Sequence, residues 1–133
     1  MHRKDETLLL LQSNLEAILD FNVGEVSHEV TADRALQEIG ALIRKLDDAE
    51  AIAARLKQHG LGKVGSVTQG DGRSEPLYLR DMTNKVAHCS KFSWQTDAQR
   101  VECTSREPLR WKSATIDLTL LKEVVQIMVT LQP

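Results

Sequence analysis

The sequence has few of the features that mark specialised classes of protein. It contains only two cysteines, Cys89 and Cys103, with no Cys-x-x-Cys pair and no histidine at zinc-ligand spacing beside them. We therefore expect no metal and no cofactor, and both thiols to be small buried groups in a reducing compartment. The apolar run from Leu8 to Leu11 is too short to cross a bilayer, and the segment from His2 to Glu6 lacks the apolar core of a secretory signal. These absences predict a cytoplasmic protein without a membrane segment.

An excess of positive charge is also missing. The 17 lysines and arginines are outnumbered by 19 acidic residues, which gives a formal net charge of -2. No global basic field attracts nucleic acid, so any polyanion would have to be held by a local cluster. Length and an apolar content of 41% are those of one ordinary globular domain, and no repeat or long linker divides the chain. We expect a single domain over residues 1–133.

Apolar residues recur at helical spacing over much of the chain. The pattern predicts a first helix over roughly residues 5–21 and a long helical stretch over residues 31–59, which is either one kinked helix or two consecutive ones. The glycine-rich segment from Gly60 to Arg73 predicts a flexible loop. Asp117 is expected to cap a C-terminal helix with an apolar stripe.

Two further patterns complete the expected architecture. Pro76 suits the first turn of a helix that runs to about Cys89. Alternating residues over 92–103, with a turn at Asp97 to Gln99, predict a small β-hairpin, and a third extended piece at Leu109 to Lys112 can join it. The expected fold class is mainly α, a helical bundle of four to five helices with a small β-hairpin inserted before the C-terminal helix.

The predicted helix over residues 76–89 carries the best candidate for a site. Arg80, Asn84 and His88 are each four residues apart, so they share one face of the helix opposite its apolar stripe. Lys85 and Thr83 flank them. A bidentate cation, an orienting amide and a side chain that titrates near neutral pH can hold a phosphodiester, and His88 can act as general acid or base toward a ribose 2′-hydroxyl without a metal. The alternative is a polar helix face that is merely solvated.

Aromatic and basic residues near the predicted hairpin also allow two interpretations. Phe92, Trp94 and Trp111 can stack on bases of single-stranded RNA, or they can pack the hairpin onto the helices. Arg110 and Lys112 belong to a local basic cluster that can contact phosphates or simply keep an exposed edge in solution. We include both among the candidate substrate-binding residues, with Lys85 and Thr83.

The string Leu-Arg-Asp-Met-Thr-Asn-Lys-Val-Ala-His at residues 79–88 resembles proteins of the HEPN superfamily, the "higher eukaryotes and prokaryotes nucleotide-binding" proteins. The segments Trp111 to Ala114 and Ile116 to Leu118 extend the resemblance, which covers about residues 75–131. It implies a helical bundle that forms a homodimer, with the polar motifs of two protomers making a metal-independent endoribonuclease site. Many relatives act as toxins or in phage and plasmid conflict, often beside an antitoxin-type protein partner.

The resemblance also implies roles for individual residues. His88 would transfer protons, Asn84 would orient the substrate, and Arg80 and Lys85 would bind phosphate. The family's motif places an arginine directly before the asparagine, where this sequence has Thr83, and Arg80 lies one turn earlier. Three functions therefore compete: a HEPN-like ribonuclease, a catalytically inactive HEPN-like RNA-binding or regulatory module, and a helical antitoxin or immunity subunit.

Overall fold

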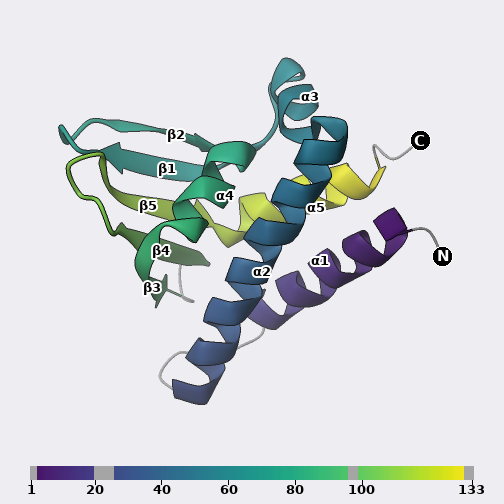
Figure 1. Cartoon of the computed structure of the whole chain (residues 1–133), viewed down its shortest axis with the longest axis horizontal. Helices are drawn as coiled ribbons and strands as arrows, with labels where there is room; N and C mark the ends of the chain where they lie inside the picture. The colour runs from purple at the N-terminus through teal and green to yellow at the C-terminus, as the bar shows by residue number, and fades with distance from the viewer. Residues whose placement is uncertain (1–2, 20–25, 96–98, 131–133) are drawn as a thin grey trace.

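The computed structural model describes residues 3–19, 26–95 and 99–130, which form five helices and one five-stranded sheet (Figure 1). Three helices come first in the chain, and the strands follow with the last two helices among and after them. The helices are α1 (Arg3–Leu19), α2 (Val26–Glu50), α3 (Ile52–Gln58), α4 (Leu79–Ala87) and α5 (Leu118–Thr130). The strands are β1 (Lys63–Gln69), β2 (Ser74–Tyr78), β3 (Cys89–Gln95), β4 (Arg100–Ser105) and β5 (Trp111–Asp117).

The sheet has the strand order β2-β1-β5-β4-β3, and all neighbouring strands are antiparallel. Its central pair, β1 with β5, joins segments that are far apart in the sequence. The two backbones come so close at Gly65 that a Cβ atom there would overlap the carbonyl oxygen of Thr115. Glycine is therefore required at this position by the pairing of the strands, not by a loop.

The expectation of a mainly α bundle with one small hairpin is wrong, because the protein has a sheet of five strands. The segment from Gly60 to Arg73, expected to be a loop, contains β1. The segment from Ser74 to Tyr78, expected to open a helix, is β2, and the helix begins only at Leu79. The third extended piece is β5, which begins at Trp111 and is longer than expected.

Other expectations about individual elements are confirmed. Strands β3 and β4 pair as the predicted hairpin, although two of its three predicted turn residues, Asp97 and Ala98, lie outside the described part of the chain. Asp117 caps α5, since its Oδ1 accepts the backbone N–H groups of Thr119 at 2.9 Å and Leu120 at 3.1 Å. The helical stretch expected over residues 31–59 is two helices that meet at Ala51, and the first of them begins earlier than expected, at Val26.

One face of the sheet is apolar and covered by helices. Directly opposed residues of neighbouring strands point to the same face, so Val67, Ala114 and Cys103 share it, and all three are buried. Helix α4 lies across this face and contacts β1, β2, β4 and β5, and α2 packs against α4 (Figure 1). The contact between the helices is close, because a Cβ atom at Gly40 would lie 3.3 Å from Cγ1 of Val86.

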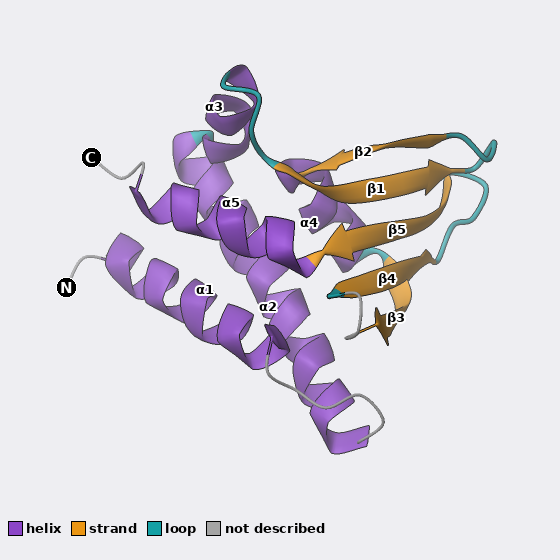
Figure 2. Ribbon diagram, turned by 180° about the vertical axis from the view of Figure 1, so that it is seen from behind, coloured by secondary structure: helices purple, strands orange, loops and turns teal. Residues whose placement is uncertain are grey.

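The other face of the sheet is polar. Ser66, Thr115 and Glu102 occupy opposed positions on its three central strands, and none of them is buried. Seen from this side, no described helix crosses the strands (Figure 2). The described part of the protein is thus a two-layer arrangement in which any site on α4 lies on the helical side.

The N-terminal helices extend the core beyond the sheet. Helix α1 packs on α2 and α5, and fully buried side chains such as Leu11, Ile39 and Leu121 fill the space between helices. Each such side chain contributes roughly 1.5–3 kcal/mol by leaving water. Strand β3 is tied to α2 by Trp94, whose Nε1 donates to Oδ1 of Asp33 at 2.7 Å. None of the helices in the described ranges has the length and apolar character needed to span a membrane.

Candidate functional site

Helix α4 carries most of the predicted site residues. Leu79, Met82 and Val86 are buried against the core, as the apolar stripe predicts. On the other side of the helix, Asn84 and His88 are exposed. His88 directly follows the last helical residue and has a non-helical backbone conformation (φ -109°, ψ 20°). The polar stripe therefore ends where the chain leaves α4 for β3.

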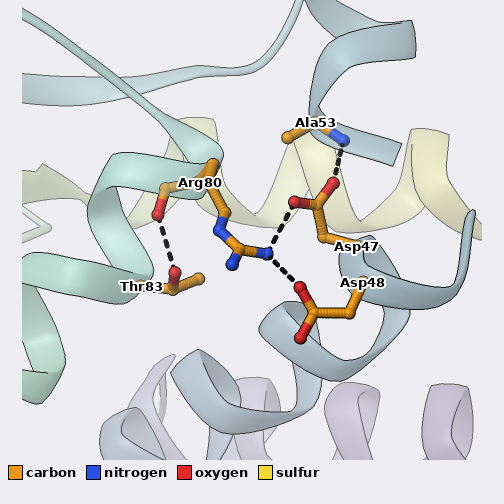
Figure 3. A network of polar contacts seen from close by, with 5 residues as sticks. All are labelled: Asp47, Asp48, Ala53, Arg80 and Thr83. Atoms are coloured by element: carbon orange, nitrogen blue, oxygen red, sulfur yellow. Dashed lines mark hydrogen bonds and ion pairs between the residues drawn. The ribbon is translucent and has the colours of Figure 1, made fainter. Parts of the chain in front are cut away.

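Arg80, near the start of α4, is held by two carboxylates from the end of α2. Its Nη1 donates to Oδ2 of Asp47 at 2.8 Å and to Oδ1 of Asp48 at 2.7 Å (Figure 3). Asp47 also accepts, through Oδ1, the backbone N–H of Ala53 at 2.7 Å. The hydrogen bonds from the guanidinium to Asp48 and Asp47 raise the pKa of Arg80 above its usual range. Arg80 thus joins α4 to the junction of α2 and α3.

A small recess lies beside the other end of α4, and we name it the His88 pocket. Its volume is about 210 Å³, and the end of β1, the β4–β5 connection and α4 contribute to it. Inside it, Lys85 is only 10% exposed, with Nζ 3.0 Å from Oδ1 of Asp81 and 5.1 Å from the ring centroid of Trp111. The lysine ammonium is therefore fixed in position by a carboxylate and an aromatic ring. The lining residues are Gln69, Asn84, Lys85, His88, Glu107, Arg110 and Trp111.

A larger recess lies at the start of α4, and we name it the Tyr78 cleft. Its volume is about 730 Å³, and it opens between the α2–α3 junction and the β2–α4 junction. The ring of Tyr78 forms part of the wall, and Nζ of Lys57 lies 4.9 Å from the ring centroid. The cleft is lined by Arg44, Asp47, Ala51, Ala53, Ala54, Lys57, Pro76, Tyr78, Arg80, Asp81 and Asn84.

The structure divides the predicted stripe between these two recesses. Arg80 lines the Tyr78 cleft, His88 lines the His88 pocket, and Asn84 lines both. Arg80 and His88 are eight positions apart, which corresponds to about 12 Å along a helix axis. Arg110 joins His88 and Lys85 in the smaller pocket. In a single copy of the chain, Arg80 and His88 therefore do not line a common recess.

Two predicted binding residues line neither recess. Thr83 is 3% exposed, and its Oγ1 donates to the carbonyl oxygen of Arg80 at 2.6 Å. Lys112 is exposed on β5, next to the buried Trp111. Thr83 therefore uses its hydroxyl within α4, whereas Lys112 is accessible from solvent.

Sequence reasoning did not identify Gln69 and Glu107 as site residues. They reach α4 only because β1 pairs with β5 and the β4–β5 connection returns beside the helix. No local motif in the sequence signals that approach. Trp111, for which the sequence allows either base stacking or packing, is 6% exposed, which agrees with packing.

The residue after His88 is Cys89, and both Cys89 and Cys103 are buried free thiols. The thiol of Cys89 on β3 donates to the carbonyl oxygen of Lys91 at 2.8 Å, and its interaction with Cys103 on β4 lowers the pKa of Cys89 and raises the pKa of Cys103. Burial contributes further to the raised pKa of Cys103. Among residues 3–19, 26–95 and 99–130 no group of three or more histidine, cysteine or acidic side chains is arranged to hold a metal ion.

Together the two recesses offer hydrogen-bond donors and positive charge along one side of α4. The His88 pocket presents an imidazole, an ammonium, a guanidinium and two amides, and its carboxylate from Glu107 lies 3.5 Å from Nε of Arg110. Such a set can bind an oxyanion through several donors. The chain matches no family model, no curated protein and no solved structure at a significant level, so its function has to be argued from these residues.

Proposed function

We propose that this protein is cytoplasmic and binds single-stranded RNA through a backbone phosphate that lies in the His88 pocket. We further propose that it does not cleave the strand. The observation that carries the proposal is that Lys85 and His88, at the end of α4, line one small recess together with Arg110 from the β4–β5 connection. The amides of Asn84 and Gln69 also line the recess, and Nε2 of Gln69 donates to Oε2 of Glu75 at 3.2 Å. Phosphate oxygens are acceptors that suit such a set of donors.

Each of the two cations of the pocket is paired with a carboxylate, and the two pairs differ in exposure. The pair of Arg110 with Glu107 is 3.5 Å long, and its side chains are 81% and 60% exposed. An ion pair this exposed contributes little to stability, so Arg110 can turn toward a ligand at small cost. Lys85 is different, because its buried ammonium is held in place before a ligand arrives. The pocket thus combines one fixed cation with one adjustable cation.

The size of the pocket indicates which part of RNA it accepts. Its volume of about 210 Å³ is below the roughly 300–1,000 Å³ that is typical of small-molecule sites. Trp111 lies under Lys85 and is buried, so its face is not open for a base to stack on. A phosphate group fits this description better than a nucleobase. We therefore expect binding with little preference for base sequence.

The arrangement favours binding over cleavage. The ribonuclease expected from the sequence needs an arginine and His88 on the same phosphate, yet Arg80 lies about 12 Å away along the axis of α4 and is engaged by Asp47 and Asp48. Cleavage by the predicted pair of Arg80 and His88 would therefore need Arg80 of a second copy of the chain, because the arginine beside His88 in one copy is Arg110, which is paired with Glu107. The HEPN-like resemblance, the homodimer and an antitoxin-type partner stay predictions. The helical bundle that the resemblance implies is not the fold of this chain.

Fluorescence anisotropy with a labelled ten-nucleotide oligouridylate tests the proposal. His88→Gln and Arg110→Gln are expected to weaken binding about tenfold each, because a hydrogen bond to a charged group contributes roughly 1.5–3 kcal/mol. The slope of log affinity against log salt should become shallower by about 0.7 for each phosphate that the variant no longer neutralises. Lys122→Gln, which removes an exposed charge from α5, is the matched control and should bind like the unaltered protein.

Two results would contradict the proposal. One is unchanged affinity in both pocket variants, or an equal loss in the α5 control. The other is degradation of the oligonucleotide in EDTA by the unaltered protein but not by His88→Gln, which would restore the ribonuclease interpretation. Light scattering on the same samples measures whether the chain is the predicted homodimer.

A further inference from the structure

We infer that the Tyr78 cleft is a second binding site, for a small molecule that carries a planar ring and one anionic group. The inference does not depend on RNA binding, because the cleft lies at the opposite end of α4 from the His88 pocket. Its volume of about 730 Å³ is within the range of roughly 300–1,000 Å³ found for small-molecule sites.

The cleft owes its open space to the way α2 ends. Ala51 adopts a left-handed conformation (φ 52°, ψ 43°), which costs a residue with a side chain about 1–2 kcal/mol and turns α3 away from the axis of α2. Three small residues, Ala51, Ala53 and Ala54, then line the cleft where larger side chains would fill it. The hydrogen bonds that Ala53 and Arg80 donate to the carboxylate of Asp47 hold this geometry in place.

Positive charge in the cleft is left unneutralised. Of its two carboxylates, Asp47 shares Arg80 with Asp48, which lies outside the lining, and Asp81 is paired with Lys85 at 3.0 Å. Arg44 and Lys57 form no ion pair with any residue in the described part of the chain. Two cations that share a recess and lack acidic partners attract an anion.

The aromatic wall determines the rest of the ligand. Tyr78 is half-buried, and Nζ of Lys57 forms a cation–π contact with its ring, 4.9 Å from the ring centroid. Pro76 and the small alanines continue the apolar surface around this ring. A planar ring can lie against this surface while its anionic group bonds to Lys57 and Arg44. The amide of Asn84 remains at the rim as a donor or acceptor for polar atoms of the ring.

A phosphate and a carboxylate share this anionic chemistry, so the experiment has one probe for each. Isothermal titration calorimetry is carried out with adenosine monophosphate and with benzoate, and uncharged adenosine serves as the comparison ligand. We expect at least one of the two anions to bind, and adenosine to bind at least tenfold more weakly than the monophosphate if that probe is the one bound. The anion that binds identifies the group that the site accepts.

Three variants locate the binding in the cleft. Lys57→Gln and Arg44→Gln each remove one unpaired charge and should weaken binding about tenfold, the equivalent of about 1.4 kcal/mol. Ala54→Leu should block the cleft, because Ala54 is exposed and a leucine is well tolerated on a helix surface. Lys45→Gln is the matched control, since Lys45 is exposed on α2 but does not line the cleft. Circular dichroism verifies that each variant is folded.

The inference is overturned if neither anion binds the unaltered protein. It is also overturned if Lys45→Gln weakens binding as much as Lys57→Gln, or if Ala54→Leu binds with full affinity. The oligouridylate assay with His88→Gln and Arg110→Gln is run on separate samples. The two proposals are therefore tested with different ligands and different variants, so that one can be refuted without the other.

Discussion

Replacement of Asp47 by alanine should destabilise the protein more than replacement of its neighbour Asp48. Asp47 is 12% exposed and bonds both the backbone N–H of Ala53, in the first turn of α3, and the guanidinium of Arg80. A side chain that satisfies an N–H of the first helical turn contributes about 1 kcal/mol, and a partly exposed ion pair adds about 0.5–1 kcal/mol. The expected loss for Asp47→Ala is therefore about 1.5–2 kcal/mol of unfolding free energy.

Asp48 provides the matched comparison. It bonds the same atom of Arg80 at 2.7 Å, but its side chain is 62% exposed and makes no bond to α3 among those the structure describes. Asp48→Ala should cost at most about 0.5 kcal/mol. Arg80→Ala should fall between the two, because Asp47 then still bonds Ala53. Urea unfolding followed by circular dichroism gives the three values on one scale.

Equal losses for Asp47→Ala and Asp48→Ala would refute this reasoning. They would mean that the bond from Asp47 to Ala53 contributes nothing measurable to the junction of α2 and α3. A larger loss for Arg80→Ala than for Asp47→Ala would show instead that the guanidinium, not the carboxylate, is the centre of the network in Figure 3.

Three further predictions concern the sheet. Gly65→Ala should cost at least about 2 kcal/mol in urea unfolding, because the added Cβ atom overlaps a carbonyl of β5, and an unchanged midpoint would contradict the close approach. Trp94→Phe removes the donor to Asp33 and should cost about 1.5–3 kcal/mol, measured by thermal unfolding, with no loss expected only if that bond is not formed. Maleimide should label Cys89 before Cys103, because the pKa of Cys89 is lowered and that of Cys103 is raised, so on raising the pH the Cys89 thiolate forms first; equal labelling by peptide mass spectrometry would contradict this.

Most of the helices were predictable from the sequence, although α4 begins later than expected, but of the sheet only the β3–β4 hairpin and part of β5 were predictable. The hairpin of β3 and β4 was identifiable because its apolar residues alternate. In β1 the apolar residues Val64 and Val67 are three apart, since the register shifts between Lys63 and Gly65. This irregularity removes the period of two by which a strand is identified. The glycines in and around β1 are typical of loops, so the sequence pattern predicts a loop for this segment.

Strand β2 was mistaken for the start of a helix because of Pro76. A proline without a backbone N–H suits the first helical turn, but it also suits an edge strand, where one side of the backbone needs no partner. Strand β2 is at the edge of the sheet. The sequence offers no local means of choosing between these two places, because the choice depends on whether β1 exists as a partner.

The polar stripe of α4 illustrates what helical spacing can and cannot predict. Residues four apart share a face, so the spacing of Arg80, Asn84 and His88 predicts which way they point. It does not predict what lies beside each of them, and on α4 the neighbours differ at each end. At one end the break after α2 brings two carboxylates to the arginine, and at the other end the β4–β5 connection brings Arg110 to His88. Because the partners of each residue come from distant segments, a single helix face supports two separate recesses, and only Asn84 belongs to both.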